Sequence, residues 1–188
     1  MWVNQCSNKG SVSLESAGGI QFYAGGIIGD MANSVSVRQS VNRGSVEAEF
    51  CAGGLVGRMS GSNGAVTSNY NTGDVLANSY AGGLIGVMTG ASGGSQVACC
   101  YNIGDVNLNI SGKCIGALFG AMLDGTYTNL TALKNPANAS LPLVGLLNGS
   151  ASTGEYLEAD QMKKESFLNA LLASGNHFIK DYMNAQDG

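Results

Sequence analysis

The stretch SYAGGLIGVMTG, residues 79–90, decides how this chain folds. It is apolar and rich in glycine, and nearly the same phrase occurs as YAGGIIGDM from Tyr23 and as CAGGLVGRM from Cys51. The phrase is too broken for a helix, because each glycine in a helix interior costs about 1 kcal/mol. It is also too short to span a bilayer, which takes about 20 apolar residues. A short phrase that returns along a chain indicates a repeat architecture.

A second phrase, built around asparagine, alternates with the first. Its four copies are SNKGSV (7–12), VNRGSV (41–46), YNTGDV (70–75) and YNIGDV (101–106). The copies of the first phrase are AGGIIG (24–29), AGGLVG (52–57), AGGLIG (81–86) and a worn GKCIGA (112–117), with LVGLLNG (143–149) in a decayed fifth unit. Asn8, Asn42, Asn71 and Asn102 are 34, 29 and 31 residues apart. The repeating unit therefore has about 30 residues and contains both phrases.

Glycine decides between a helical and a β-structured repeat. Of the 29 glycines, 27 precede Glu155, which leaves no room for helices of ordinary length in the repeats. Short apolar runs separated by Asn, Gly, Ser and Thr are typical of strands and turns. The sequence predicts an all-β fold, a parallel β-solenoid of right-handed β-helix type. We expect four to five coils over residues 5–150, with equivalent strands in register about 4.8 Å apart.

Two columns of equivalent residues follow from this stacking. The phrase asparagines are expected to stack and to hydrogen-bond from coil to coil, as a structural line. The valines four residues after each asparagine are expected to form a core column: Val12, Val46, Val75 and Val106. Because neighbouring side chains of a strand point to opposite faces, we expect only one of Leu84 and Ile85 to enter the core.

Composition limits the classes of partner. The chain has 188 residues, of which 12% are charged, with a net charge of −4 and a sequence pI near 4.8. It contains no cluster of Lys and Arg, so we expect no nucleic-acid partner. It contains no run of about 18 apolar residues, so we expect no membrane insertion. Since no secretory signal pattern opens the sequence, the chain is expected to be either cytosolic or a piece of a longer secreted polypeptide.

The charge density changes near Gly154 and predicts two parts, solenoid repeats in residues 1–154 and a helical cap or tail in 155–188. EADQMKKESFLNALLAS (158–174) is typical of an amphipathic helix. Its apolar stripe consists of Phe167, Leu168, Leu171 and Leu172. We expect this helix to cover the last coil, whose unpaired strand edges would otherwise invite aggregation. Residues 129–145 contain both prolines and are expected to form irregular final turns.

The paired phrases resemble the GLUG-motif family, whose repeats read C-Y-N-x-G-x-V followed by G-G-L-[VI]-G. The match covers about residues 5–150, and the tail 156–181 resembles the segment that closes such cassettes. The family's Cys before Tyr-Asn matches Cys6 and Cys100, whereas the other two units carry Ser40 and Asn69. The resemblance implies a bacterial surface protein, either a large secreted adhesin-like chain or the stalk of an IgA-specific metallopeptidase. The motif defines a structural repeat and implies no active site.

The residues that carry chemistry elsewhere form no recognisable site in this sequence. His177 is the single histidine and has no partner pattern for a triad or a metal site. The cysteines are odd in number, lack C-x-x-C spacing and are interpreted as small packing residues without disulfides: Cys6, Cys51, Cys99, Cys100 and Cys114. We therefore predict no catalytic, cofactor-binding or metal-ligating residue.

Acidic and asparagine positions leave two smaller questions open. Asp74 and Asp105 occupy the same place in neighbouring units, where they are either solvated or bridged by a cation. Asn-x-Ser/Thr sequences occur at Asn109, Asn129, Asn138 and Asn148, as expected by chance in a chain of this composition.

These observations favour a non-catalytic structural or adhesive repeat module of a secreted bacterial cell-surface protein. Such a module acts as a stalk or contacts a host extracellular protein or glycan, and the rest of a larger polypeptide accompanies it. The alternatives are an accessory β-helical segment of a large secreted enzyme, such as an IgA-type metallopeptidase, and a carbohydrate-active β-helix.

Overall fold

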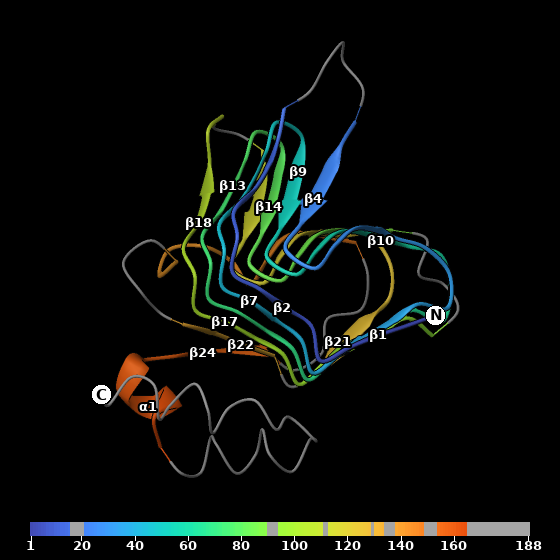
Figure 1. Ribbon diagram of the computed structural model, residues 1–188. Helices are drawn as coiled ribbons and strands as arrows, with labels where there is room; N and C mark the ends of the chain where they lie inside the picture. Colours follow the sequence, from blue (N-terminus) through green and yellow to red (C-terminus); the bar gives the residue numbers. More distant parts are fainter. Residues whose placement is uncertain are drawn as a thin grey trace.

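The computed structural model describes residues 1–15, 21–89, 94–110, 113–128, 130–133, 138–148 and 154–164. These residues form an all-β parallel solenoid, and each full coil gives one strand to each of five sheets (Figure 1). The predicted fold class is confirmed.

The five sheets, named A to E in chain order, consist entirely of parallel strands. Sheet A contains β1 (Trp2–Asn4), β6 (Ser36–Arg38), β11 (Ala65–Thr67), β16 (Gln96–Ala98) and β21 (Thr126–Thr128). Sheet B contains β2 (Ser7–Asn8), β7 (Val41–Asn42), β12 (Tyr70–Asn71), β17 (Tyr101–Asn102), β22 (Leu130–Leu133) and β24 (Gly154–Leu157). Sheet C contains β3 (Val12–Leu14), β8 (Val46–Ala48), β13 (Val75–Ala77) and β18 (Val106–Leu108). Sheet D contains β4 (Tyr23–Gly25), β9 (Cys51–Gly53), β14 (Tyr80–Gly82) and β19 (Cys114–Gly116). Sheet E contains β5 (Ile28–Met31), β10 (Val56–Ser60), β15 (Ile85–Thr89), β20 (Phe119–Met122) and β23 (Val144–Leu147).

The register of the strands follows the sequence repeat. The four phrase asparagines face one another along sheet B. The four valines of the predicted column face one another along sheet C in the same way, and the column is confirmed. Equivalent residues therefore stack directly, because each coil repeats the cross-section of the coil before it.

The fourth copy of the glycine phrase lies three residues later than the sequence indicated. Phe119 faces Ile85, so the fourth copy is IGALFG (115–120) and not GKCIGA (112–117). The connection that precedes β19 is longer in this coil. An alignment of the sequence copies alone therefore places the fourth phrase three residues too early. Strand pairing follows the inward-pointing apolar side chains, and Leu118 accordingly fills the position of the preceding coil's leucine.

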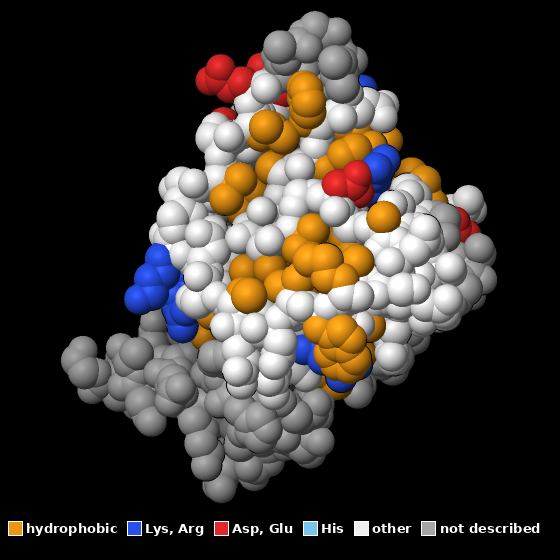
Figure 2. Space-filling view, turned by 45° about the vertical axis from the view of Figure 1, so that its right-hand side comes forward, with side chains coloured by type: hydrophobic (Ala, Val, Ile, Leu, Met, Phe, Trp, Pro, Cys, Tyr) orange, Lys and Arg blue, Asp and Glu red, His pale blue; other side chains and the backbone are white. Residues whose placement is uncertain are grey.

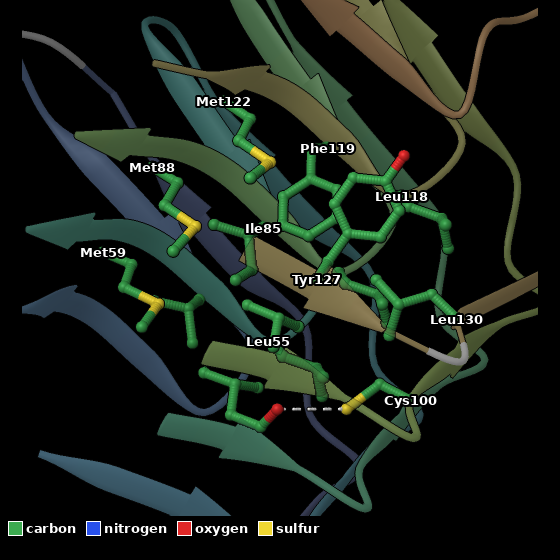
Figure 3. Packing of buried hydrophobic residues seen from close by; sticks show 14 of the residues in the cluster. Leu55, Met59, Ile85, Met88, Cys100, Leu118, Phe119, Met122, Tyr127 and Leu130 are labelled. Carbon is green, nitrogen blue, oxygen red and sulfur yellow. Dashed lines mark hydrogen bonds between the residues drawn. The ribbon is translucent and has the colours of Figure 1, made fainter. Parts of the chain in front are cut away.

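The core divides into two lobes of different width. Sheets C and D face each other in a narrow arm, seen in the upper part of Figure 1, which small side chains fill. The fully buried members of the narrow arm are Ala24, Val46, Ala48, Ala52, Val75, Ala77, Ala81 and Val106. Sheets A, B and E enclose a wide lobe filled by Leu, Met, Ile and Phe. Figure 3 shows Met59, Met88 and Met122 in this lobe, on successive strands of sheet E.

Leu84 and Ile85 are both fully buried in the wide lobe, and the expectation that only one of them enters the core is wrong. Leu84 lies at the bend between β14 and β15, outside either strand. The alternation of side chains holds only within a strand, so both side chains reach the interior at this corner. Their backbone N–H groups both donate to the carbonyl of Leu118, at 2.9 and 3.1 Å.

An asparagine ladder runs through the interior where the two lobes meet. Asn71 Nδ2 donates to Asn102 Oδ1 at 2.9 Å and to the carbonyl of Gly73 at 2.7 Å. Asn71 Oδ1 accepts a hydrogen bond from Asn42 Nδ2 at 2.8 Å. These three asparagines have no exposed surface. The predicted ladder is confirmed, and it satisfies buried amides that would be costly without partners.

The second glycine of each AGG phrase lies against this ladder. A Cβ on Gly54 would lie 2.2 Å from the carbonyl oxygen of Gly83 and 2.4 Å from the side chain of Asn71. A Cβ on Gly83 would likewise lie 2.1 Å from Asn102 Nδ2. Glycine is required at Gly54 and Gly83 because an asparagine side chain and a backbone carbonyl of the next coil lie too close for a Cβ. The two repeated phrases are therefore the two sides of one contact, which we call the waist.

The C-terminal end of the described chain departs from the repeat. β22 and β24 extend sheet B through residues that were expected to be irregular or to begin the tail. The predicted helix starts as α1 (Ala159–Met162), and Met162 is buried. α1 ends at Met162 with Lys163 as its C-cap, so the predicted helix over 158–174 is interrupted after its first turn. Residues 165–174, which carry the apolar stripe, lie outside the described residues. In the described part of the chain, no helix has the length and apolar character needed to cross a membrane.

Replacing Asn71 by alanine is expected to lower the free energy of unfolding by about 3 kcal/mol, because it leaves buried amide and carbonyl groups of two coils unpaired. Urea titration measures the loss. Asn107→Ala makes the same chemical change on the exposed side of β18 and is expected to cost less than about 0.5 kcal/mol. Equal losses for the two variants would contradict a structural role for the ladder.

Candidate functional site

A groove on the outer face of sheet A is the site with the most varied chemistry. It encloses about 490 Å³ and is lined by Trp2, Asn4, Arg38, Gln39, Thr67, Ser68, Ala98 and Cys99. The eight residues form four pairs, one from each of the first four coils. We call this site the lateral groove.

Strand alternation places these side chains outside the solenoid. The central residues of the sheet A strands stack in register and point into the wide lobe: Val3, Val37, Val66 and Val97. The residues on either side of them therefore point outward. Asn4, Arg38, Thr67 and Ala98 form one outward column, each four residues before a ladder asparagine.

A left-handed residue follows the sheet A strands β6, β11 and β16 and gives the groove its second column. Gln39, Ser68 and Cys99 have φ values of 48°, 58° and 54°. The next residue in each coil turns inward and bonds backbone groups of its neighbours. Asn69, for example, accepts from the Ser40 N–H at 2.8 Å through Oδ1. The groove therefore rests on a hydrogen-bonded corner that is repeated from coil to coil.

Trp2 and Arg38 form the chemically distinctive end of the groove. The guanidinium carbon of Arg38 lies 4.7 Å from the centre of the Trp2 ring, within the range of a cation–π contact. Trp2 remains 71% exposed. In the described part of the chain, Arg38 has no carboxylate partner. The site thus offers an open aromatic ring beside an unneutralised cation.

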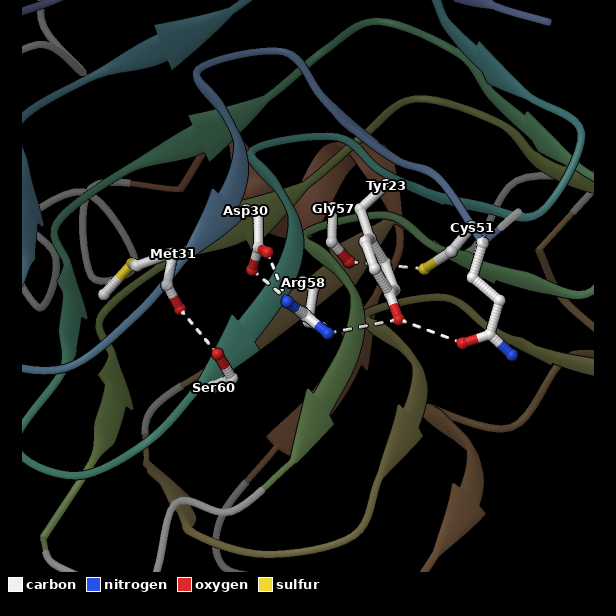
Figure 4. A network of polar contacts seen from close by, with 8 residues as sticks. Tyr23, Asp30, Met31, Cys51, Gly57, Arg58 and Ser60 are labelled. Atoms are coloured by element: carbon white, nitrogen blue, oxygen red, sulfur yellow. Dashed lines mark hydrogen bonds and ion pairs between the residues drawn. The ribbon is translucent and has the colours of Figure 1, made fainter. Parts of the chain in front are cut away.

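A second hollow, of about 570 Å³, lies beside Tyr23 and differs in its electrostatics. Arg58 Nε donates to Asp30 Oδ1 at 2.8 Å, and a second guanidinium nitrogen pairs with the other carboxylate oxygen. The same guanidinium lies 4.3 Å from the centre of the Tyr23 ring (Figure 4). The hydrogen bond to Asp30 is the main cause that raises the pKa of Arg58 above its ordinary value. Its charge is satisfied within the protein, so this hollow offers little to a ligand.

The five cysteines are free thiols in different surroundings. Cys51 and Cys100 are buried packing residues, as predicted, and burial raises the pKa of both thiols. Cys100 donates to the carbonyl of Val66 at 3.5 Å and lies among the residues of the wide lobe (Figure 3). Cys6 is exposed, and the packing interpretation is wrong for this residue.

Asp74 and Asp105 lie on neighbouring coils, as the repeat requires. Asp74 Oδ1 accepts a hydrogen bond from the backbone N–H of Asp105 at 3.0 Å. A backbone donor therefore meets one of the two carboxylates. Among the described residues, no three His, Cys, Asp or Glu side chains gather closely enough to hold a metal ion. His177 and Asn129 lie outside the described residues.

Asn138 has a structural role that the sequence did not reveal. It is fully buried, although it begins one of the Asn-x-Ser/Thr sequences. Its Oδ1 accepts from the Val106 N–H at 3.0 Å, and its Nδ2 donates to the carbonyl of Gly104 at 3.0 Å. Among the described residues sheet C ends at β18, and this side chain bonds backbone groups at that edge of the sheet. Asn109 and Asn148 are exposed.

Sequence reasoning missed the lateral groove. The constant four-residue offset from the ladder asparagines would have placed its outward column, because register carries over from one sheet to the next. The contact between Trp2 and Arg38 and the hollow itself depend on side-chain packing across coils. The sequence also predicted that the chain has no catalytic or metal-binding residue. The lateral groove does not test that statement, which stays a prediction.

Comparison with protein-family models, with curated proteins and with solved structures finds no match to the chain.

Thiol reactivity is expected to divide the cysteines by burial. The thiolate is the reactive form, and burial raises the pKa of Cys100 to about 12. In native protein at pH 8, iodoacetamide is expected to alkylate Cys6, whereas Cys51 and Cys100 react only after unfolding in urea. Peptide mass spectrometry measures the extent at each site. Equal native labelling of Cys6 and Cys100 would contradict the buried position of Cys100.

The same burial predicts a dependence of stability on pH. The folded pKa of Cys100 lies above its ordinary value of 9.0, so its stabilising effect is complete below pH 9 and is lost as the pH rises toward 12. Relative to Cys100→Ala, the wild-type chain is expected to lose about 1.4 kcal/mol per pH unit in this range. Urea titrations at pH 8 and 10.5 measure this difference. Cys6→Ala is the matched control and should show the wild-type slope.

Proposed function

We propose that this chain is a non-catalytic structural or adhesive module of a secreted bacterial surface protein. The observation that carries the proposal is the continuous asparagine ladder, in which each side chain bonds the next from Asn8 to Asn102. A ladder of this kind lets coils be added without a change in cross-section. The product is a stiff rod with a repeated outer face, which suits a stalk and the display of weak, multiple contacts.

The distribution of polar groups also supports this role. The buried amides bond neighbouring coils, and the buried cysteines have raised pKa values that keep them as neutral thiols. On the face seen in Figure 2, charged side chains are few, and hydrophobic groups lie scattered among uncharged polar ones. Such a surface suits contacts with a host protein or glycan better than it suits acid–base chemistry.

Two measurements test the proposal. Antibody raised against the purified chain is expected to label intact cells of the source organism, with cells that lack the gene as the control. Labelling that appears only after lysis would contradict a surface role. The complete gene is expected to encode a secretion signal, further repeats and an anchor. A downstream H-E-x-x-H sequence would instead favour an accessory segment of a metallopeptidase.

Catalysis is tested directly on polysaccharides. The chain is expected to release no reducing ends from a panel of neutral and acidic polysaccharides, beyond the release by heat-denatured protein. Turnover of any of them that is lost in Asp30→Asn or Asp74→Asn would overturn the non-catalytic proposal in favour of a carbohydrate-active β-helix.

A further inference from the structure

The lateral groove has the shape of a track that crosses the coils. Its four residue pairs come from four successive coils, so it extends over three coil spacings of about 4.8 Å, or roughly 14 Å. Equivalent positions recur at this constant spacing along the track. A linear ligand with repeated units therefore fits this groove better than a compact molecule does.

The lining of the groove combines one aromatic ring with short polar side chains. Trp2 presents a large amphipathic ring that is 71% exposed, although burial of such a ring is normally favourable. Asn4 and Thr67 add amide and hydroxyl groups along the same wall. Apolar C–H groups over an aromatic face and hydroxyl groups within reach of amides are the contacts that a saccharide ring requires.

The charge of the groove selects among saccharides. Arg38 is the single charged residue among the eight that line it, and no carboxylate lies among them. The contact with the Trp2 ring holds the guanidinium at the wall of the groove. A guanidinium recognises carboxylates through paired, charge-assisted hydrogen bonds. The groove is therefore complementary to an anionic sugar.

We propose that the lateral groove binds an acidic glycan, a linear saccharide that carries carboxylate groups, with Trp2 as the stacking surface and Arg38 as the carboxylate ligand. The proposal rests on the adhesive form of the proposed function and names its ligand class. A nucleic acid is disfavoured because binding to phosphates requires several cations, and the chain has a net charge of −4. A protein partner is disfavoured because Trp2 is the one large apolar side chain of the groove.

The single tryptophan makes the test direct, because Trp2 is the only source of tryptophan fluorescence in the chain. The full chain, tagged at its C-terminus to leave Met1 and Trp2 free, is titrated with tetragalacturonate. A saturable change in fluorescence that weakens as salt increases is expected. A neutral galactan tetramer of the same length is expected to bind at least about tenfold more weakly.

Two arginine variants test whether binding depends on the arginine of the lateral groove or on positive charge elsewhere on the surface. Arg38→Gln is expected to weaken tetragalacturonate binding at least about tenfold. Arg43→Gln is the matched control, since Arg43 also lies over an aromatic ring, that of Tyr70, but follows β7 and is outside the groove. It should bind as the wild type does. Trp2→Ala is followed by calorimetry and is expected to lose binding, with circular dichroism and thermal unfolding showing that both groove variants remain folded.

Several outcomes would overturn the proposal. If the neutral tetramer bound as tightly as tetragalacturonate, the carboxylates would have no part in recognition. If Arg43→Gln weakened binding as much as Arg38→Gln does, binding would not be specific to the lateral groove. Displacement of tetragalacturonate by polyglutamate at the same carboxylate concentration would indicate general anion binding. Absence of binding to every glycan would overturn this ligand class but leave the surface role intact, because cell labelling and the gene test that role separately.

Discussion

The waist contact between asparagine and glycine is the constraint on which the rest of the structure depends. The ladder of buried amides bonds each coil to the next, and each amide also lies against the phrase glycine of the preceding coil. Asn71 can occupy that position only because Gly54 has no side chain, and Gly54 can be buried there only because the amides are paired. Each phrase therefore requires the other, which explains why Gly26, Gly54 and Gly83 are each followed, one coil later, by a ladder asparagine.

The shape of the core follows from the waist. By bringing two walls together, it divides the cross-section into a narrow arm between sheets C and D, whose fully buried side chains are alanine and valine, and a wide lobe, which needs leucine, methionine and phenylalanine. Because every coil repeats this division, like residues stack on like residues along the axis. The alanine in the fourth coil fits the pairing of phrase glycine with ladder asparagine: Ala117 stands where the others have glycine, and the next ladder position is Ala132 in place of an asparagine. Asn102 Nδ2 donates to the carbonyl of Ala117 at 3.1 Å.

The same stacking explains where function is able to reside. The interior amides are committed to coil–coil bonds, so ligand chemistry is left to the outward positions of the strands and to the turns between sheets. Outward positions of equivalent strands form tracks across the coils, and variation within one track is independent of the core. In sheet A this freedom places Trp2 and Arg38 side by side without any change in the valines beneath them. At the hollow beside Tyr23 the same freedom produces an internal ion pair instead.

The sequence by itself determined the solenoid, its unit of about 30 residues, the asparagine ladder and the valine column, because each is a property of a strictly repeated pattern. The sequence prediction placed the fourth glycine phrase three residues too early and wrongly put only one of Leu84 and Ile85 in the core. Both outcomes depend on where the backbone bends at a corner, which the repeat pattern does not specify. Only the tertiary structure revealed that the two phrases touch, that Asn138 bonds the edge of sheet C, and that Trp2 meets Arg38 in a groove. These contacts join residues of different coils, whose distance is set by how closely the backbone packs.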